Sequence, residues 1–144
     1  MLDRVIERYE DAVVADSENV DAWIGLSAAV CQLYFRSPAE FEKIAERAVR
    51  CAERGVEMSP DYWKSWAQLG VARAFYGEAQ LAESALLKAL EFAPNNSNAH
   101  YYYAAYLSSM NTRRDEALAT VQRALEINPN NAAARRLQQK LLIL

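Results

Sequence analysis

The chain has 144 residues, a length typical of a single domain. Hydrophobic residues make up 52% and charged residues 24%, which excludes a disordered polyelectrolyte. The net charge of -3 provides no general attraction to phosphate backbones or anionic lipids, so we expect neither nucleic acid nor membrane partners. Only four glycines and four prolines interrupt a chain rich in alanine and leucine, which excludes an all-β fold and favours helices.

Residues 1–19 are predicted to form one helix and a turn. Val5, Tyr9 and Ala12 fall on one face of that helix, because they are spaced by four and three residues. The first ten residues contain no apolar core of a signal peptide, and nowhere does the chain approach the ~18–20 apolar residues that span a bilayer. We therefore expect a cytoplasmic location, with a domain excised from a longer protein as the alternative.

The prolines of the remaining chain reveal an internal repeat. Pro60 and Pro94 are 34 residues apart, and Pro94 and Pro129 are 35 apart. Between the first two, large and small residues occupy fixed spacings: Trp66, Leu69, Gly70, Gly77, Ala82, Leu86 and Ala89. A period of this length is typical of stacked helical hairpins.

This pattern resembles the tetratricopeptide repeat, whose W-x2-L-G-x2-Y, A-x3-F and final Pro it follows. Two positions depart from it, since Arg73 stands where Tyr is expected and Leu86 replaces Phe. The resemblance extends over residues 20–129 as three repeats. It implies an all-α, right-handed solenoid of helical hairpins with about eight helices.

The first repeat, residues 20–60, carries Trp23 and Ala48 at the matching positions, with nine extra residues between them. The segment from Ser37 to Glu40, with Pro38 at its second position, has the form of a capping box, so we expect the second helix to begin at Pro38 and to be longer than its counterparts.

The second repeat covers residues 61–94 and the third covers residues 95–129. In the third repeat His100 replaces the tryptophan, and we expect it to have a packing role. Residues 130–144 are predicted to form a helix that covers the C-terminal end of the solenoid, while residues 1–19 form a second helix without its partner.

The resemblance also implies a function: a non-catalytic module for protein–protein interaction, in which the first helices of successive repeats line a concave groove. Carried over position by position, the lining consists of Asp21, Ile24, Ala28, Cys31, Gln32, Lys64, Ala67, Gln68, Val71, Phe75, Asn98, Tyr101, Tyr102, Ala105 and Ser108.

The lining predicts the kind of ligand. One subfamily grips the C-terminal carboxylates of chaperone tails with lysine, arginine and asparagine, but those positions hold Ile24, Ala28, Gln68, Asn98 and Tyr102 here. Burying a carboxylate without enough cationic partners costs several kcal/mol. We therefore expect an apolar or aromatic-bearing peptide or helix, anchored on aromatic side chains of the groove: Phe75, Tyr101 and Tyr102.

A second candidate surface is the extra turn, which contains Tyr34, Phe35 and Phe41. These aromatics form either a contact surface or a small core beneath the turn.

The chain offers little for catalysis. It has one histidine and no glycine-rich phosphate loop, and Cys31 and Cys51 are interpreted as small buried hydrophobic residues. We therefore expect no enzyme activity, metal or cofactor. Two alternatives to the peptide-binding module stay open. One is a scaffold that assembles as a homo-oligomer through the ends of the solenoid, and the other is a secretion-type chaperone for an unfolded client.

Overall fold

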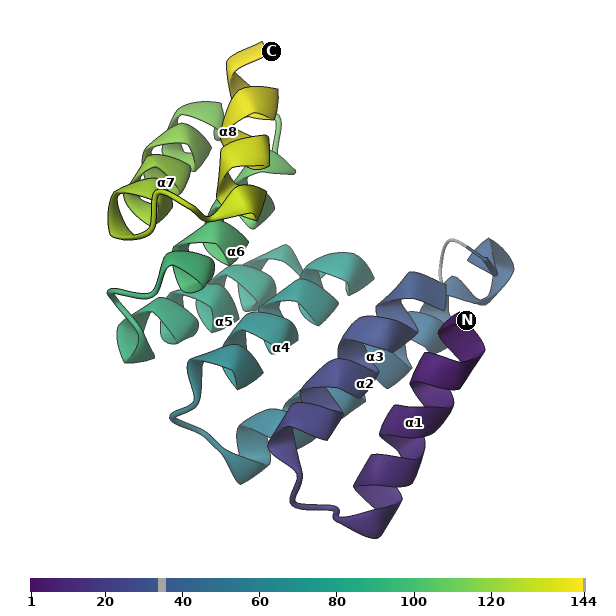
Figure 1. The fold of residues 1–144 in the computed structure, drawn as a ribbon. Coiled ribbons are helices and arrows are strands. Elements are labelled where there is room, and N and C mark those ends of the chain that lie inside the picture. The colour runs from purple at the N-terminus through teal and green to yellow at the C-terminus, as the bar shows by residue number, and fades with distance from the viewer. Residues whose placement is uncertain (34–35, 144) are drawn as a thin grey trace.

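A computed structural model describes residues 1–33 and 36–143 of the chain. Within these ranges the protein consists of eight α-helices and a short 3-10 turn (Figure 1). The elements in chain order are α1 (Leu2–Ala15), α2 (Val20–Gln32), η2 (Pro38–Glu40), α3 (Phe41–Met58), α4 (Trp63–Tyr76), α5 (Ala79–Phe92), α6 (Ser97–Ser108), α7 (Arg114–Ile127) and α8 (Ala132–Ile143). The predicted all-α fold is confirmed.

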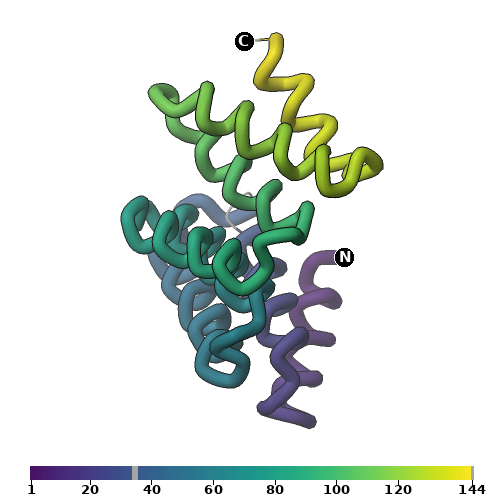
Figure 2. The backbone as a smooth tube through the Cα atoms, turned by 90° about the vertical axis from the view of Figure 1, so that its left-hand side faces the viewer, coloured from purple at the N-terminus to yellow at the C-terminus, as the bar shows by residue number. Residues whose placement is uncertain are grey.

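The helices stack as hairpins along the chain. Helices α2 and α3, α4 and α5, and α6 and α7 pair as hairpins, with α1 before them and α8 after them (Figures 1 and 2). Buried side chains form two clusters, a first core among α1–α4 and a second core among α6–α8. Helix α5 contributes Ala85 to the first core and Ala82 and Leu86 to the second, so it joins the two.

Small side chains allow the hairpins to close. Ala48, Ala82 and Ala117, at matching positions of α3, α5 and α7, are all 0% exposed. A Cβ atom added to Gly70 of α4 would lie 2.6 Å from Cγ of Leu86, so the glycine is required for the close approach of α4 and α5. The spacing of small residues in the sequence therefore reports the contact faces of the helices.

The turns that lead into α2, α4, α6 and α8 share one geometry. In each, a backbone N–H donates to the carbonyl three residues earlier, and the donors are Asn19, Tyr62, Asn96 and Asn131. The three asparagines also cap the following helix, because each side-chain oxygen accepts a hydrogen bond from the N–H three residues later. Tyr62 has no such side-chain oxygen, and α4 begins without a side-chain cap.

One ring position is held by the same hydrogen bond in all three hairpins. The indole Nε1 of Trp23 donates to the carbonyl of Ser17 at 2.9 Å, and that of Trp66 to the carbonyl of Pro60 at 2.6 Å. His100 Nε2 lies 2.8 Å from the carbonyl of Pro94 and is the donor, because a carbonyl oxygen only accepts. His100 thus supplies the same ring N–H donor that the tryptophans supply at this position.

The tyrosine position of the motif is also explained. The Arg73 side chain is 19% exposed, and its Nη2 lies 2.9 Å from Oε1 of Glu53 on α3. A second carboxylate, that of Glu78, lies 3.5 Å from Nη1. Arg73 therefore links α4 to the preceding hairpin through charge.

The expected capping box at Ser37 is wrong. The Ser37 side chain makes no capping hydrogen bond, and the N–H of Glu40 donates to the backbone carbonyl of Ser37 at 3.0 Å. This backbone bond closes a 3-10 turn, so α3 begins at Phe41 rather than at Pro38. The helix is nevertheless longer than its counterparts, with 18 residues against 14 in α5 and α7.

The aromatic residues predicted at this turn have different outcomes. Tyr34 and Phe35 lie outside the described residues. Phe41 is half-buried, and its ring centroid lies 5.5 Å from that of Phe75 on α4. This contact supports the interpretation of Phe41 as part of a local core.

Candidate functional site

A pocket of about 300 Å³ lies between the first helices of the three hairpins. We call it the central pocket; its lining residues are Ile24 of α2, Trp63, Lys64, Ala67 and Gln68 of α4, and Asn98 and Tyr102 of α6. Apart from Trp63, these residues were all predicted from the sequence as lining the groove. Trp63 was missed because the predicted lining of that helix began one residue later, at Lys64.

The other predicted groove residues do not line this pocket. Cys31 and Phe75 pack against the first core, and Tyr101 packs against the second. Ala28 and Gln32 line a separate cavity beside α1, and Asp21 lines another. Val71, Ala105 and Ser108 are half-buried on the same helices as the pocket residues.

Aromatic rings form one wall of the central pocket. The ring centroids of Trp63 and Tyr102 lie 6.4 Å apart with planes tilted by 45°, and the ring of Tyr101, outside the pocket, lies 5.6 Å from that of Tyr102. Tyr102 remains 37% exposed, whereas Tyr106 on the same helix is 8% exposed and donates to the carbonyl of Ala79 at 2.9 Å. The two tyrosines differ in role, because only Tyr106 is built into the interior.

Gln68 is oriented by a buried chain of hydrogen bonds. The hydroxyl of Ser27 donates to the backbone carbonyl of Ala48 at 2.7 Å, so its oxygen is left to accept. Gln68 Nε2 donates to that oxygen at 3.1 Å. Gln68 is 9% exposed, and its amide is held with the nitrogen toward α2, which leaves Oε1 as an acceptor.

Asn98 is oriented by the cap of α8. Asn131 accepts from the N–H of Ala134 through Oδ1, so its Nδ2 faces α6 and donates to Oδ1 of Asn98 at 3.0 Å. Because Oδ1 of Asn98 is taken by Asn131, Nδ2 is left as the free donor of this pocket-lining residue.

The two cysteines are thiols without a disulfide. Burial raises the pKa of Cys31 to about 11, and burial also raises the pKa of Cys51. Both thiols therefore stay protonated near neutral pH. Thiolate chemistry would require a lowered pKa instead.

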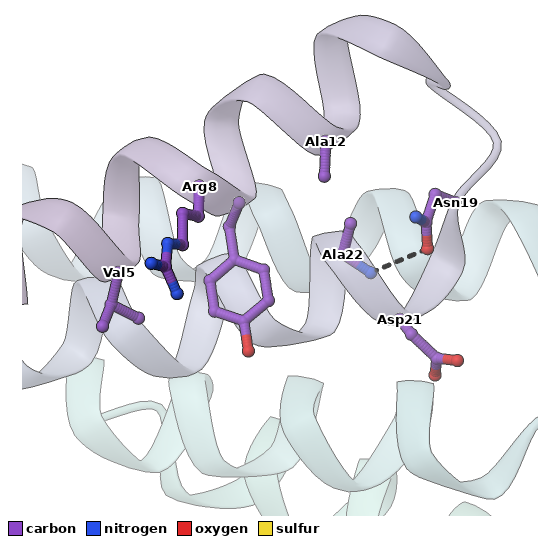
Figure 3. Close-up of a pocket in the computed structure, with 7 residues that line it drawn as sticks. Val5, Arg8, Ala12, Asn19, Asp21 and Ala22 are labelled. Carbon is purple, nitrogen blue, oxygen red and sulfur yellow. Dashed lines mark hydrogen bonds between the residues drawn. The ribbon is translucent and has the colours of Figure 1, made fainter.

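A larger cavity of about 550 Å³ lies at the N-terminal end of the solenoid, between α1 and the start of α2. We call it the end cavity; in Figure 3, Ala12 of α1 points toward Ala22 of α2, and Asn19 caps α2 beside them. Val5 of α1 is 36% exposed, although its counterparts Ala48 and Ala82 are fully buried by a facing helix. Within the described residues, this face of α1 is therefore more open than the matching faces of α3 and α5.

Among residues 1–33 and 36–143, no group of three or more His, Cys, Asp or Glu side chains is arranged to hold a metal ion. Over the same ranges, no helix is both long and apolar enough to cross a bilayer.

Comparison with known proteins finds one matching family model and several similar structures. The family model described as tetratricopeptide repeat matches residues 85–119, which run from α5 into α7 and include His100. No curated protein sequence matches the chain. A thermophilic TPR protein from Thermus thermophilus has a similar structure, with a TM-score of 0.89 and 26% identity over 99% of this chain and 74% of its own.

Two further structures share the fold at lower identity. YrrB, described as a TPR protein with an unusual peptide-binding site, has a TM-score of 0.57 and 20% identity over 99% of this chain and 68% of its own. The first TPR of Spaghetti (RPAP3), bound to the HSP90 peptide SRMEEVD, has a TM-score of 0.60 and 19% identity over 81% of this chain and 90% of its own. Residues 85–119 thus match a tetratricopeptide repeat, and the chain shares its hairpin solenoid fold with these TPR proteins.

Proposed function

We propose that the chain is a peptide-binding interaction module whose ligand occupies the central pocket. The observation that carries this proposal is the partly exposed wall of Trp63 and Tyr102 beside oriented amide groups. Aromatic side chains in such positions are enriched at binding hot spots. The fold supports an interaction role, and both YrrB and the Spaghetti domain are described with peptide sites.

The charge of the pocket favours an apolar or aromatic-bearing ligand. Lys64 is the one charged residue among those that line it. The carboxylates of an acidic tail would lose water there and find a single ammonium partner, which costs more than the pair returns. We therefore propose that the ligand is not a carboxylate-clamped chaperone tail, and that its affinity depends weakly on salt.

The experiment selects peptides from a random display library on the whole chain and measures their affinity by calorimetry. Tyr102→Ala should weaken binding by roughly 2 kcal/mol, about 30-fold, as loss of a hot-spot aromatic does. Its melting temperature should change little, because Tyr102 is already 37% exposed.

Phe92→Ala is the matched control. Phe92 is 41% exposed, and Nζ of Lys88 lies 5.5 Å from its ring centroid, much as Lys64 lies 6.0 Å from Trp63. It is absent from the pocket lining. If Phe92→Ala reduces affinity as much as Tyr102→Ala, or if affinity collapses between low and physiological salt, the central pocket is not the binding site.

A second candidate function is self-assembly, which the end cavity favours. Helix α1 carries four acidic and two basic residues, whereas the charged residues of α8 are all basic. A second copy can therefore approach the end cavity with its α8 under electrostatic attraction. Light scattering over a concentration series tests this: a molecular mass that rises for the wild type and stays constant for Val5→Glu supports assembly, whereas a constant monomer mass rejects it.

A further inference from the structure

The polar groups of the central pocket define what a ligand must offer. Lys64 Nζ is an ammonium with three donors, and Asn98 Nδ2 adds two more. Within the described part of the chain, no side-chain or backbone oxygen accepts a hydrogen bond from either group or from the Tyr102 hydroxyl. Among the polar groups of the pocket, Gln68 Oε1 acts as an acceptor. The pocket therefore offers more donors than acceptors, and it fits a ligand with exposed carbonyl oxygens and few N–H groups.

Charged side chains fit the pocket poorly. Lys64 Nζ already lies 6.0 Å from the ring centroid of Trp63, so a ligand cation at that ring meets a like charge. An anion has one ammonium partner, as described above. Neutral carbonyl dipoles, by contrast, present partial negative charge to Lys64 and Asn98 without the desolvation cost of a full charge.

A helical ligand also fits poorly. In an α-helix the carbonyl oxygens accept from N–H groups within the same helix, apart from the last turn. Such a ligand leaves the donors of Lys64, Asn98 and Tyr102 without partners. An extended segment keeps its carbonyl oxygens free, and a polyproline II segment does so while also removing the N–H of each proline.

We propose that the central pocket binds an extended, proline-containing segment in the polyproline II conformation, a proposal that rests on the peptide-binding function above. A proline ring packs against the surface formed by the tilted rings of Trp63 and Tyr102. Backbone carbonyls of the segment accept hydrogen bonds from Lys64 and Asn98, and the N–H of one non-proline residue donates to Gln68 Oε1. Aromatic-lined grooves recognise polyproline II segments in this way, because the ligand loses little conformational entropy on binding.

Fluorescence anisotropy with the whole chain tests the ligand class. The probes are three labelled dodecapeptides: four Pro-Pro-Ala repeats, the same peptide with every proline replaced by alanine, and an amphipathic helical peptide with Leu and Phe on one face. We expect saturable binding of the Pro-Pro-Ala peptide with an affinity at least about tenfold above that of the alanine peptide, since the alanine peptide must lose more conformational entropy.

Asn98→Asp tests the donor directly. The aspartate keeps an oxygen for Asn131 Nδ2 but replaces the donating amide by a second acceptor, so binding of the Pro-Pro-Ala peptide should weaken about tenfold or more. Tyr102→Phe removes the hydroxyl and keeps the ring, and a smaller loss is expected. Phe92→Ala should stay within about twofold of wild type because it lies outside the pocket.

The outcomes separate the two proposals. Binding of the helical peptide that depends on Tyr102, without binding of the Pro-Pro-Ala peptide, overturns the polyproline II proposal and leaves the peptide-binding function in place. Binding of Pro-Pro-Ala that Asn98→Asp does not change also overturns it. If neither these probes nor library-selected peptides respond to Tyr102→Ala, the proposed function itself is wrong.

Discussion

The two junctions between neighbouring hairpins combine the same kinds of interaction in different proportions. Where α2 and α3 meet α4, Gln68 donates to Ser27 and Ser27 donates to Ala48 in the interior, and Arg73 pairs with Glu53. Where α5 meets α6 and α7, Tyr106 donates to the carbonyl of Ala79, and the Glu83 carboxylate pairs with Arg113, their side chains being 27% and 25% exposed. A buried hydrogen bond costs much when one partner is lost, whereas a solvent-accessible ion pair is screened and contributes little.

The comparison also shows how the molecule divides. The first core and its buried junction form a unit from α1 to α4, and the second core reaches that unit through α5. The hydroxyl of Tyr103 lies 3.4 Å from the same Glu83 carboxylate, so one acidic side chain serves several partners at the weaker junction. We expect the second junction to open more readily than the first.

The largest effect is expected from the residue that joins the cores. Leu86→Ala should lower the free energy of unfolding by about 2–5 kcal/mol, because Leu86 is 1% exposed and truncation leaves a cavity against Gly70. Urea denaturation followed by circular dichroism measures it. Leu87→Ala, at a side chain that is 47% exposed, serves as the control and should stay within about 0.5 kcal/mol. Equal effects would mean that α5 does not join the cores through Leu86.

The buried junction comes next. Ser27→Ala removes the acceptor of Gln68 Nε2 and leaves a largely buried donor without a partner, so stability should fall by about 1–3 kcal/mol. The same denaturation measurement applies. If the free energy of unfolding changes as little as it does for an exposed residue, water has replaced the serine hydroxyl as the acceptor of Gln68. The contrast between the two junctions would then disappear.

A stabilising change is expected beside the same junction. The Ser65 hydroxyl is buried and has no hydrogen-bond partner within the described residues, whereas the matching positions of α2 and α6 hold Ala22 and Ala99. Ser65→Ala should raise the free energy of unfolding by about 1 kcal/mol, because the unpaired hydroxyl no longer has to be desolvated. A loss of stability would instead show that the hydroxyl has a partner in solution.

The smallest effect is expected at the ion pair. Glu83→Gln should cost at most about 1 kcal/mol, and the loss should shrink in high salt. The three tryptophans all lie in α2 and α4, so fluorescence reports on the first core while circular dichroism reports on every helix. We expect the variant to separate these two unfolding transitions, with part of the circular dichroism signal lost first. Coincident transitions would show that the weaker junction does not open independently.

Sequence reasoning predicted most of the fold because the repeat makes it local. The 34-residue period, the small residues and the prolines all describe contacts within one hairpin or between adjacent ones, and the eight helices follow from them. The predicted start of α3 was wrong because a capping box and a 3-10 turn share the same four residues, and residue spacing does not distinguish the side-chain cap from the backbone hydrogen bond that forms.

The pocket was predictable in position but not in chemistry. The repeat register placed Gln68 and Asn98 at the site, since it specifies which face of each helix is inward. Which atom each amide presents depends on Ser27 and Asn131, which are 41 and 33 residues away in sequence. Hydrogen bonds between residues so distant in sequence cannot be recognised from residue spacing. The balance of donors and acceptors in the pocket could therefore be determined only from the structure.

The ring position shared by Trp23, Trp66 and His100 bears on how such repeats are detected. By hydropathy, tryptophan and histidine are dissimilar, yet the family model matches the segment that contains His100. The structure shows that the position selects a planar ring with an N–H directed at the carbonyl six residues upstream. A substitution score based on that geometry would treat tryptophan and histidine as interchangeable at this position. Such a score would also apply to repeats that have no tryptophan.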